Sequence, residues 1–458
     1  MRNGEISLAQ AAQCCGGTVA AEYAEKTFRG ANFDTRRLQR GELFVAITGA
    51  RDGHDFAADA LQKGAAAVLA SKPLAAEIPA IYVRDTVAAL QAIAAGYRRT
   101  LPLKSVGITG SVGKTTTKEM IAAVLETTYR TEKTAANFNN GLGLPVTVLG
   151  LQPDCEAAVL EMGMNHFGEL SVLTRIAQPD IAVITNIGTM HIEHLGSREG
   201  ILQAKLEILR GVPESGLGVF NGDEPLLWNI RNDGGHKKRY FGIENAACDV
   251  VATDIQELED GMRFMVSGLG HHFELFVPSA GRHSVYNALA AVTVALLLGM
   301  PPEKIQTQLE GFRNTGMRQR IYTQNGMTII EDCYNAGPES TQAALEVLGN
   351  YHTTGRRIAV LGDMLELGNR SSAEHYRIGR IAATKADMLF TYGHHSLRTV
   401  TGAITGGMAP KNAEHFDTHE DLAHVLRTRA AEGDVLLFKG SRGMKMEQAL
   451  HLFLDEEK

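Results

Sequence analysis

A glycine-rich segment between an apolar run and an amphipathic segment constrains the fold of this chain more than any other feature. The apolar run is Val106–Thr109, and the glycine-rich segment Gly110–Thr116 (GSVGKTT) follows it directly. From about Thr115 to Thr128, apolar residues recur at helical spacing. A strand, a glycine-rich turn and a helix in this order are the setting of a phosphate-binding loop. The sequence therefore predicts an α/β domain that binds a nucleotide.

This loop supplies the groups that bind a triphosphate. Glycines let backbone N–H groups approach phosphate oxygens, and the N-terminus of the following helix carries a partial positive charge. Lys114 can reach the β- and γ-phosphates, and the Thr115 hydroxyl can bind Mg²⁺. The strict motif would have a glycine where this chain has Ile108, and the loop alone does not define a reaction. The predicted nucleotide-binding residues of the loop are Gly110, Ser111, Val112, Gly113, Lys114, Thr115 and Thr116.

The rest of the chain divides into further α/β blocks. Its 458 residues are enough for about three domains. Short apolar segments alternate with helical ones in residues 1–100, 101–312 and 313–458, which predicts parallel sheets with crossover helices. Residues 249–277 alternate apolar and polar side chains and predict a small antiparallel insertion. We expect an α/β protein with a central parallel-sheet ATPase domain, an α/β domain before it and a Rossmann-like domain after it.

Individual strands and helices are predicted from apolar runs and from helical spacing. The predicted helices include Thr86–Arg99 and the apolar stretch Ala288–Met300, which we expect to be buried. The predicted strands are Leu43–Ile47, Ala67–Ala70, Ile81–Val83, Val106–Thr109, Ala157–Glu161, Ile181–Asn186, Thr328–Ile330, Arg357–Leu361, Met388–Tyr392 and Val435–Phe438.

Composition limits the partners and the location of the chain. The net charge is −7 and no basic block stands out, so we expect neither nucleic acid nor a membrane surface as the main partner. Five cysteines without paired spacing argue against a disulfide framework and a structural zinc site, and favour a reducing cytoplasm. The most apolar stretch, Ala288–Met300, is shorter than the roughly 18 residues of a membrane span. We expect a cytoplasmic protein, with a monomer as the default state.

A series of short segments accompanies the phosphate loop in a fixed order. After TGSVGKTTTKE at Thr109 come ANFNNGLGLP (from Ala136), EMGMNHFGE (Glu161), NIGTMHIEHLGS (Asn186), GRHSVYNALA (Gly281), DCYNAGP (Asp332), GDMLELG (Gly362) and KGSR (Lys439). Together with the N-terminal DTRRLQRGELFVAITGARDGHDF, this series resembles the Mur ligase family over nearly the whole chain.

The resemblance implies an ATP-dependent enzyme that forms an amide bond in bacterial peptidoglycan synthesis. In this family, ATP phosphorylates a substrate carboxylate, an amine attacks the acyl phosphate, and ADP and phosphate are released. GDMLELG and the N-terminal segment favour the member that joins D-alanyl-D-alanine to UDP-N-acetylmuramoyl-tripeptide, which yields the pentapeptide precursor of the cell wall. The resemblance further implies Mg²⁺ and a UDP-binding N-terminal domain. Because the nucleotide would lie between two of three domains, we also expect the domains to close on ligand binding.

Two other kinds of function stay open at this point. One is a sibling ligase that adds a single amino acid, or an enzyme like folylpolyglutamate synthetase. The other is a nucleotide-binding partner without catalysis, against which intact Lys114, Thr115, Glu161, His191 and Lys205 argue. The sequence also leaves open whether the third peptide residue is lysine or diaminopimelate.

The resemblance assigns metal-binding roles to residues beyond the loop. Glu161, His191 and Lys205 match metal-binding positions of the family, in which the matching lysine is carbamylated by CO₂. A carbamate is an oxygen-bearing anion, the kind of ligand that Mg²⁺ prefers. By position alone, Lys205 is a solvated helix residue and His191 a loop histidine. The implied metal set is Thr115, Glu161, His191 and Lys205, and the implied catalytic set is Lys114, Glu161, His191, Lys205 and Arg318.

The resemblance also implies contacts to nucleotide and substrates. Asn287 matches an adenine contact, Arg318 an arginine that reaches the γ-phosphate, and Asp332 a contact to ribose or to Mg²⁺ through water. The usual His-Asn pair reads His283-Ser284 here. The implied substrate residues are Thr35 and Arg36 for uridine diphosphate, Asn137, Asn139 and Asn140 for the muramoyl peptide, Tyr334 and Asn335 in the cleft, and Lys439 and Arg442 for a carboxylate.

Overall fold

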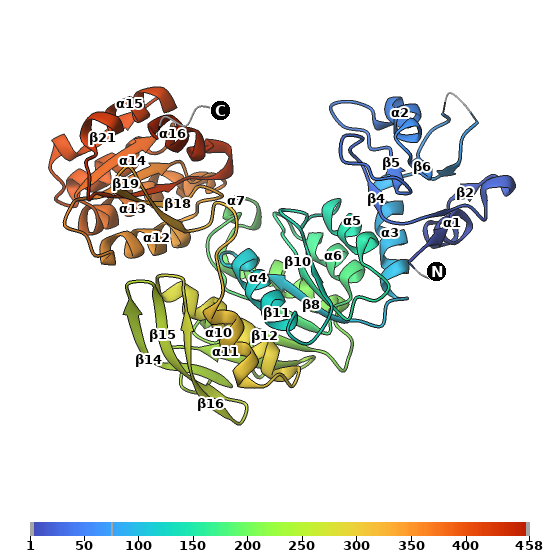
Figure 1. Cartoon of the computed structure of the whole chain (residues 1–458), viewed down its shortest axis with the longest axis horizontal. Helices are drawn as coiled ribbons and strands as arrows, with labels where there is room; N and C mark the ends of the chain where they lie inside the picture. Colours follow the sequence, from blue (N-terminus) through green and yellow to red (C-terminus); the bar gives the residue numbers. More distant parts are fainter. Residues whose placement is uncertain (1–3, 75–76, 455–458) are drawn as a thin grey trace.

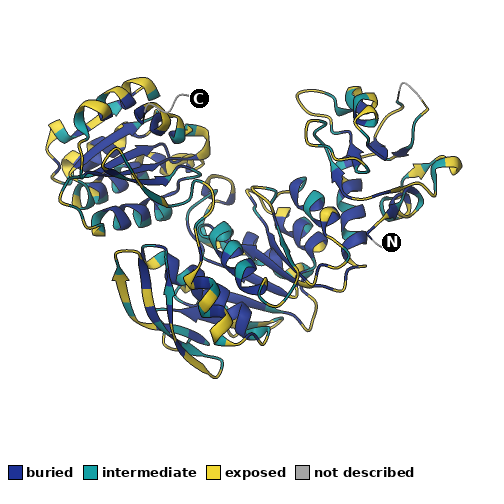
Figure 2. Ribbon diagram, viewed as in Figure 1, coloured by how far each residue is buried: buried dark blue, intermediate teal, exposed yellow. Residues whose placement is uncertain are grey.

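Three α/β domains follow one another along the chain and are joined into an open arc (Figure 1). The computed structural model describes residues 4–74 and 77–454. Sheets of five, nine and six strands belong to the N-terminal, central and C-terminal domains, so the predicted α/β class and three-domain order are confirmed. The central parallel strands are buried, and exposure concentrates on the outer sides of helices, on loops and on the antiparallel strands at the sheet edges (Figure 2). Among the described residues, no helix is long and apolar enough to cross a membrane.

The N-terminal domain is built on the sheet β2-β7-β6-β5-β4, with a separate antiparallel pair β1-β3. Strands β4 to β7 run parallel, whereas β2 is antiparallel to β7. Three of its strands lie where the sequence predicts them; the two-residue strands are too short to leave a pattern. The elements are β1 Ile6–Ser7, α1 Leu8–Cys15, β2 Thr18–Val19, β3 Thr27–Phe28, β4 Ala31–Asn32, β5 Leu43–Val45, α2 Ala57–Gln62, β6 Ala67–Ala70, β7 Ala80–Tyr82 and α3 Thr86–Arg98.

Helix α3 connects this domain to the central one. The Asp85 carboxylate caps its N-terminus by accepting from the N–H groups of Val87 and Ala88. At its other end, the Tyr97 hydroxyl donates to Leu151 O at 2.8 Å, and Arg98 Nε donates to Ala177 O at 3.0 Å. Both acceptors belong to the central domain, so α3 is anchored in it by buried hydrogen bonds.

The central domain contains the mixed sheet β16-β15-β14-β13-β12-β11-β8-β10-β9. Strands β8 to β14 pair in parallel, and β14, β15 and β16 pair antiparallel. The antiparallel strands predicted in residues 249–277 are therefore present, but they extend the main sheet instead of forming a separate insertion. Apolar residues of α4, α10 and α11 cover one face, while those of α5, α6 and α8 cover the other.

Where an apolar run or a helical repeat is clear in the sequence, the bounds of the central strands and helices lie close to the predicted ones. The strands are β8 Lys104–Thr109, β9 Thr131–Lys133, β10 Ala157–Glu161, β11 Ile181–Ile184, β12 Leu217–Asn221, β13 Lys237–Gly242, β14 Val250–Leu258, β15 Gly261–Gly268 and β16 His271–Val277. The helices are α4 Lys114–Leu125, α5 Gly143–Gly150, α6 Glu169–Ala177, α7 Ile192–Leu195, α8 Arg198–Leu206, α9 Pro225–Asn229, α10 Arg282–Leu297 and α11 Pro302–Glu310.

The C-terminal domain has the sheet β17-β18-β22-β19-β20-β21, which is parallel except for β17. Alternate residues of each strand pack on opposite faces: Leu437 joins the core under α12, α13 and α14, and Leu436 the core under α15 and α16. The elements are β17 Arg320–Gln324, β18 Met327–Asp332, α12 Pro338–Asn350, β19 Arg357–Gly362, α13 Ser371–Lys385, β20 Met388–Tyr392, α14 Leu397–Thr405, β21 Ala413–Phe416, α15 His419–Arg429, β22 Val435–Lys439 and α16 Met446–Phe453.

Candidate active site

A cavity of about 650 Å³ is lined by residues of both the central and the C-terminal domain. The phosphate loop after β8 and the residues after β10 and β11 form the central wall, since the carboxyl ends of parallel strands meet at one edge of a sheet. The C-terminal wall comes from the segments after β18 and β22. One residue of α3, Gln91, also lines the cavity, and its amide donates to Gly141 O at 2.9 Å.

The phosphate loop has backbone geometry that only glycine fits at two positions. Gly110 has φ 153°, and a Cβ there would lie 1.8 Å from Thr185 Oγ1. Gly113 has φ 84°, and a Cβ there would lie 2.5 Å from Asn287 Oδ1. Thr185, which directly follows β11, and Asn287 of α10 therefore approach the loop too closely for any side chain at these positions.

Hydrogen bonds from the segment after β11 hold the loop in place. Asn186 Oδ1 accepts from the N–H groups of Ser111 at 3.1 Å and Val112 at 2.9 Å. The Ser111 hydroxyl in turn accepts from Gly188 N–H at 2.9 Å. Asn186 begins the NIGTMHIEHLGS segment, but its sequence context alone predicted no role for it. Its position directly after a strand at the nucleotide edge is the signal that could have identified it.

Lys114 faces the cavity from the first turn of α4. Its ammonium donates to Gly110 O at 2.7 Å, so it lies folded over its own loop. Burial lowers the pKa of Lys114, the Glu161 carboxylate opposes that shift, and the Arg318 charge adds to it. These electrostatic effects place Lys114 between an anion and a second cation, as expected of a residue that receives a phosphate.

Glu161, the last residue of β10, lies next to the loop. Its two carboxylate oxygens accept separate hydrogen bonds at 2.9 Å, Oε2 from the Thr115 hydroxyl and Oε1 from the Asn139 amide. Behind it, the buried Lys118 ammonium lies 3.9 Å from Oε2 and donates to Thr134 O at 2.7 Å. Thr115 and Glu161 thus form a pair of oxygen donors at the cavity, a set that suits Mg²⁺.

The other two residues of the implied metal set differ in their relation to the cavity. His191 lines the cavity at the N-terminus of α7. Lys205, in α8, has only 2% of its surface exposed and is not among the lining residues, so its interpretation as a solvated helix residue is wrong. Among the described residues, no group of three or more His, Cys, Asp or Glu side chains is gathered for a metal ion.

The surroundings of Lys205 disfavour the charged form of its amine. Burial, followed by the charge of Lys114, lowers the pKa of Lys205 well below its usual value. A neutral amine is the form that reacts with CO₂ to give a carbamate. The helix that carries it is capped by Ser197, whose hydroxyl accepts from Gly200 N–H at 3.1 Å.

The residues expected to bind the nucleotide lie around the cavity. Asn287, in α10, accepts from the Thr117 hydroxyl at 3.2 Å and lines the cavity beside Gly113. The Arg318 guanidinium stacks on the Tyr334 ring, 3.9 Å from its centroid. The sequence places Asp332 after a strand, but it is the last residue of β18.

Two cations of the C-terminal wall are paired with carboxylates. The buried Lys439 ammonium donates to Asp332 Oδ2 at 2.6 Å and to Asn335 O at 2.9 Å. Arg442 donates to Glu447 Oε1 at 2.8 Å. Lys439 therefore ties the segment after β18 to the end of β22, which shapes this wall of the cavity.

The two residues implied for uridine diphosphate lie outside this cavity. Arg36 has 81% of its side chain exposed and forms a bidentate pair with Asp34, which lowers the pKa of that carboxyl. Thr35 precedes it in the same loop after β4. The loop with Asn137, Asn139 and Asn140 lines the cavity, and Phe138 within it packs 6.4 Å from the Phe33 ring of the N-terminal domain.

Comparisons with known proteins give one consistent result. The family model described as "Mur ligase middle domain" matches residues 108–295, "Mur ligase, glutamate ligase domain" residues 317–442, and "Mur ligase family, catalytic domain" residues 27–98. The UDP-N-acetylmuramoyl-tripeptide–D-alanyl-D-alanine ligase of Bacillus subtilis (strain 168) is 43% identical over 94% of both chains. The ligase of the same name from Escherichia coli (strain K12) is 35% identical over 97% of both.

Solved structures agree with these relatives. Crystal structure I of MurF from Acinetobacter baumannii has a TM-score of 0.90 at 31% identity and covers 99% of both chains. MurF ligase from Thermotoga maritima, solved in complex with ADP, has a TM-score of 0.83 at 30% identity and covers 93% of this chain and 97% of its own.

Proposed function

This chain belongs to the Mur ligase family, and from that premise we propose that it joins D-alanyl-D-alanine to UDP-N-acetylmuramoyl-tripeptide in an ATP-dependent reaction. The product is the UDP-N-acetylmuramoyl-pentapeptide precursor of peptidoglycan. The observation that carries the proposal is the cavity in which a phosphate loop, Glu161 and Arg318 meet between two domains. Relatives that carry this name match the chain over more than nine-tenths of its length.

In the first step, an oxygen of the tripeptide carboxylate attacks the γ-phosphorus of ATP. The bond from that phosphorus to the bridging oxygen breaks, ADP leaves, and an acyl phosphate forms. Two anions must approach each other, so fixed cations are needed at the meeting point. Lys114 and Arg318 line the cavity close enough to affect each other, and we propose that they flank the γ-phosphate.

In the second step, the amine of D-alanyl-D-alanine attacks the carbonyl carbon of the acyl phosphate. The bond from this carbon to the phosphate oxygen breaks, phosphate leaves with the electron pair, and the amine nitrogen releases its proton. Because the intermediate reacts with water, holding both substrates in one cavity favours the amide product. Closure of the C-terminal domain onto the central domain would bring Tyr334 and Asn335 to the reacting groups.

We propose that Thr115, Glu161, His191 and a carbamylated Lys205 hold Mg²⁺. Bound there, the ion would offset the charge that develops on the phosphate oxygens. The Thr115–Glu161 pair at the cavity supports the first half of this set, and the lowered pKa of buried Lys205 supports carbamylation. The amide of Asn139 keeps the Glu161 carboxylate oriented toward the loop.

The remaining assignments concern substrates and location. We propose that Asn287 and Asp332 contact the nucleoside, that Thr35 and Arg36 hold the uridine diphosphate, and that the 137–140 loop orients the muramoyl peptide. Exposure of Arg36 supports a role in binding from solvent. We also propose a cytoplasmic location, because ATP and nucleotide-linked precursors are the substrates of the reaction. A monomer is the proposed oligomeric state.

Product analysis tests this function. Purified protein would be incubated with Mg-ATP, D-alanyl-D-alanine and UDP-N-acetylmuramoyl-tripeptide carrying either lysine or diaminopimelate, and the products followed by mass spectrometry. We expect pentapeptide with equal amounts of ADP and phosphate from at least one tripeptide. Acceptance of a single amino acid alone would identify a sibling ligase, and folded protein that yields no amide would contradict the proposal.

A further inference from the structure

A loop of the C-terminal domain reaches the central domain at His191. This loop, residues 363–368, follows β19 and ends near α7. Glu366 Oε2 lies 2.6 Å from His191 Nδ1. Two residues later, a Cβ at Gly368 would lie only 3.2 Å from Glu193 Cβ, so a glycine allows the two backbones to approach. The contact is therefore part of a packed junction and is not a chance meeting of long side chains.

Both residues of this contact have unusual backbone conformations. His191 has φ 63° and Glu366 has φ 62°, in the left-handed region that residues other than glycine rarely adopt. Such conformations persist where the surrounding structure fixes them, and they concentrate at functional sites. Here two of them face each other across a domain boundary, beside the cavity.

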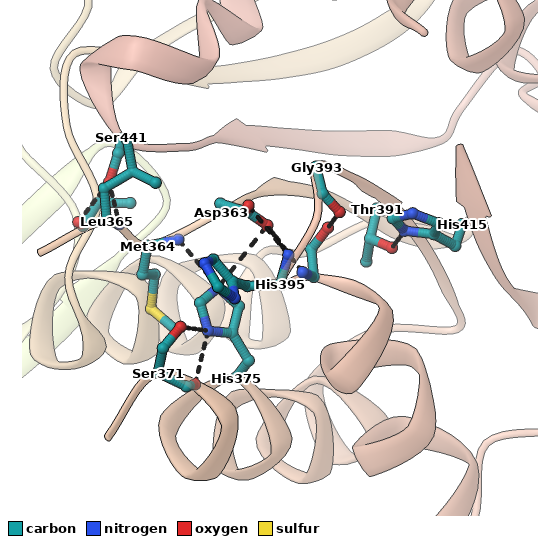
Figure 3. A network of polar contacts seen from close by, with 12 residues as sticks. Asp363, Met364, Leu365, Ser371, His375, Thr391, Gly393, His395, His415 and Ser441 are labelled. Atoms are coloured by element: carbon teal, nitrogen blue, oxygen red, sulfur yellow. Dashed lines mark hydrogen bonds and ion pairs between the residues drawn. The ribbon is translucent and has the colours of Figure 1, made fainter. Parts of the chain in front are cut away.

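A buried polar network holds the loop in this conformation (Figure 3). Met364 N–H donates to His375 Nε2 at 3.0 Å, and Leu365 N–H donates to the Ser441 hydroxyl at 2.9 Å. The Asp363 carboxylate accepts from the N–H groups of His395 at 3.0 Å and Ser396 at 2.7 Å. The three residues directly before Glu366 are thus tied to α13, to the segment after β22 and to the start of α14.

We propose that Glu366 is a positioning residue that orients the His191 ring for metal binding. This inference rests on the proposed function, in which His191 is a ligand of Mg²⁺. A carboxylate that accepts the Nδ1–H of a ligating histidine fixes its tautomer and leaves Nε2 free to bind the metal. The 2.6 Å separation is that of a charge-assisted contact, although the pair does not meet the geometry of a hydrogen bond. Such bonds often align only when ligands bind.

The arrangement makes metal binding depend on the position of the C-terminal domain. The metal ligands all belong to the central domain, but the carboxylate that orients one of them comes from the C-terminal domain. When the domains separate, His191 loses its fixed tautomer. We therefore infer that the metal site is complete only while the C-terminal domain holds Glu366 against His191.

Metal binding without turnover tests this inference. Mn²⁺, which takes similar ligands to Mg²⁺, would be titrated into the protein in the presence of ADP and followed by electron paramagnetic resonance. We expect Glu366→Ala to weaken Mn²⁺ binding about 10- to 100-fold, the range for loss of such a partner. Glu366→Gln keeps an acceptor oxygen and should fall between native and Ala. Glu414→Ala, which removes an exposed acid of the same domain, should bind as the native protein does.

A kinetic comparison separates positioning from general damage. We expect Glu366→Ala to raise the apparent KM for Mg²⁺ while the KM for D-alanyl-D-alanine stays unchanged, whereas a displaced domain would raise both. Equal Mn²⁺ binding by Glu366→Ala and the native protein would overturn the inference. Tighter binding would overturn it too, because Glu366 would then compete with the metal for His191. If the native protein forms amide product and Glu366→Ala binds Mn²⁺ as the native protein does, the proposed function stands and this inference alone fails.

Discussion

The two walls of the cavity use their charges differently. On the central wall, Lys114 donates to a backbone carbonyl, and Glu161 is held by a hydroxyl and an amide, partners that a phosphate or a metal ion could replace. On the C-terminal wall, Lys439 and Arg442 are already neutralised by Asp332 and Glu447. A free cation is available to a ligand, whereas a paired one mainly fixes the backbone. The difference indicates that Lys114 and Glu161 take part in the chemistry, together with Arg318 of the C-terminal domain, whereas Lys439 and Arg442 shape and close the site.

The largest effect should come from the central wall. Lys114→Met removes the cation nearest the phosphate loop, and we expect kcat to fall about 10²- to 10³-fold, as for loss of one preorganised electrostatic contact. The unfolding temperature should change little, because Lys114 bonds only to carbonyls of its own loop. Steady-state kinetics and thermal unfolding would be compared with Lys411→Met, an exposed lysine of the C-terminal domain. A fall in kcat of less than tenfold in Lys114→Met would contradict the assignment of a chemical role to Lys114 on the central wall.

The next effect concerns Lys205 and CO₂. Because burial lowers the pKa of Lys205 and so favours the neutral amine, we expect it to take up CO₂, and buffers stripped of CO₂ and bicarbonate should lower native activity by at least about tenfold. Bicarbonate should restore it. Lys205→Ala should be weakly active under both conditions and insensitive to bicarbonate. If the activity of the native protein does not change when CO₂ and bicarbonate are removed, the reaction does not depend on a carbamate at Lys205.

A smaller effect on catalysis, but a clear one on stability, is expected on the C-terminal wall. Lys439→Met leaves the Asp332 carboxylate without its partner, and breaking such a buried pair costs about 3 kcal/mol of folding free energy. Replacing both partners, in Lys439→Met with Asp332→Asn, should recover most of that loss in urea unfolding of the C-terminal domain. Below the unfolding transition, kcat should fall less than in Lys114→Met. An equal fall would show that Lys439 binds a substrate, and the two walls would then be alike.

The sequence predicts the residues of the central wall better than the contacts of the C-terminal wall. The phosphate loop and Glu161 lie on contiguous motifs, and strands β6, β10 and β20 have the predicted bounds because apolar runs buried on both faces are unambiguous. The pairing of Lys439 with Asp332 and of His191 with Glu366 joins segments far apart in the chain, so no local pattern reveals it. Burial of Lys205 was missed for the same reason, since the elements that cover α8 come from elsewhere in the chain.

The smallest expected effect tests the network behind the C-terminal wall. His375 Nδ1 lies 2.8 Å from Ser371 O and donates to it, so Nε2 must be unprotonated to accept from Met364 N–H. Burial lowers the pKa of His375; Asp363 and Glu374 oppose that shift and His395 adds to it. The unfolded chain therefore gains this proton near pH 6.5, before the folded chain does. Stability from this group is complete above about pH 6.5 and is lost as the pH falls toward the lowered folded pKa.

The consequence can be measured in the slope of stability against pH. One proton contributes at most about 1.4 kcal/mol per pH unit. We expect His375→Gln, whose amide oxygen can still accept from Met364, to flatten the fall in unfolding free energy between about pH 6.5 and 5.5. His424→Gln, at an exposed position of α15, should leave the slope unchanged. If both variants keep the native slope, the 363–368 loop does not depend on a neutral His375, and the rigidity of the C-terminal wall must come from Asp363 and Ser441 alone.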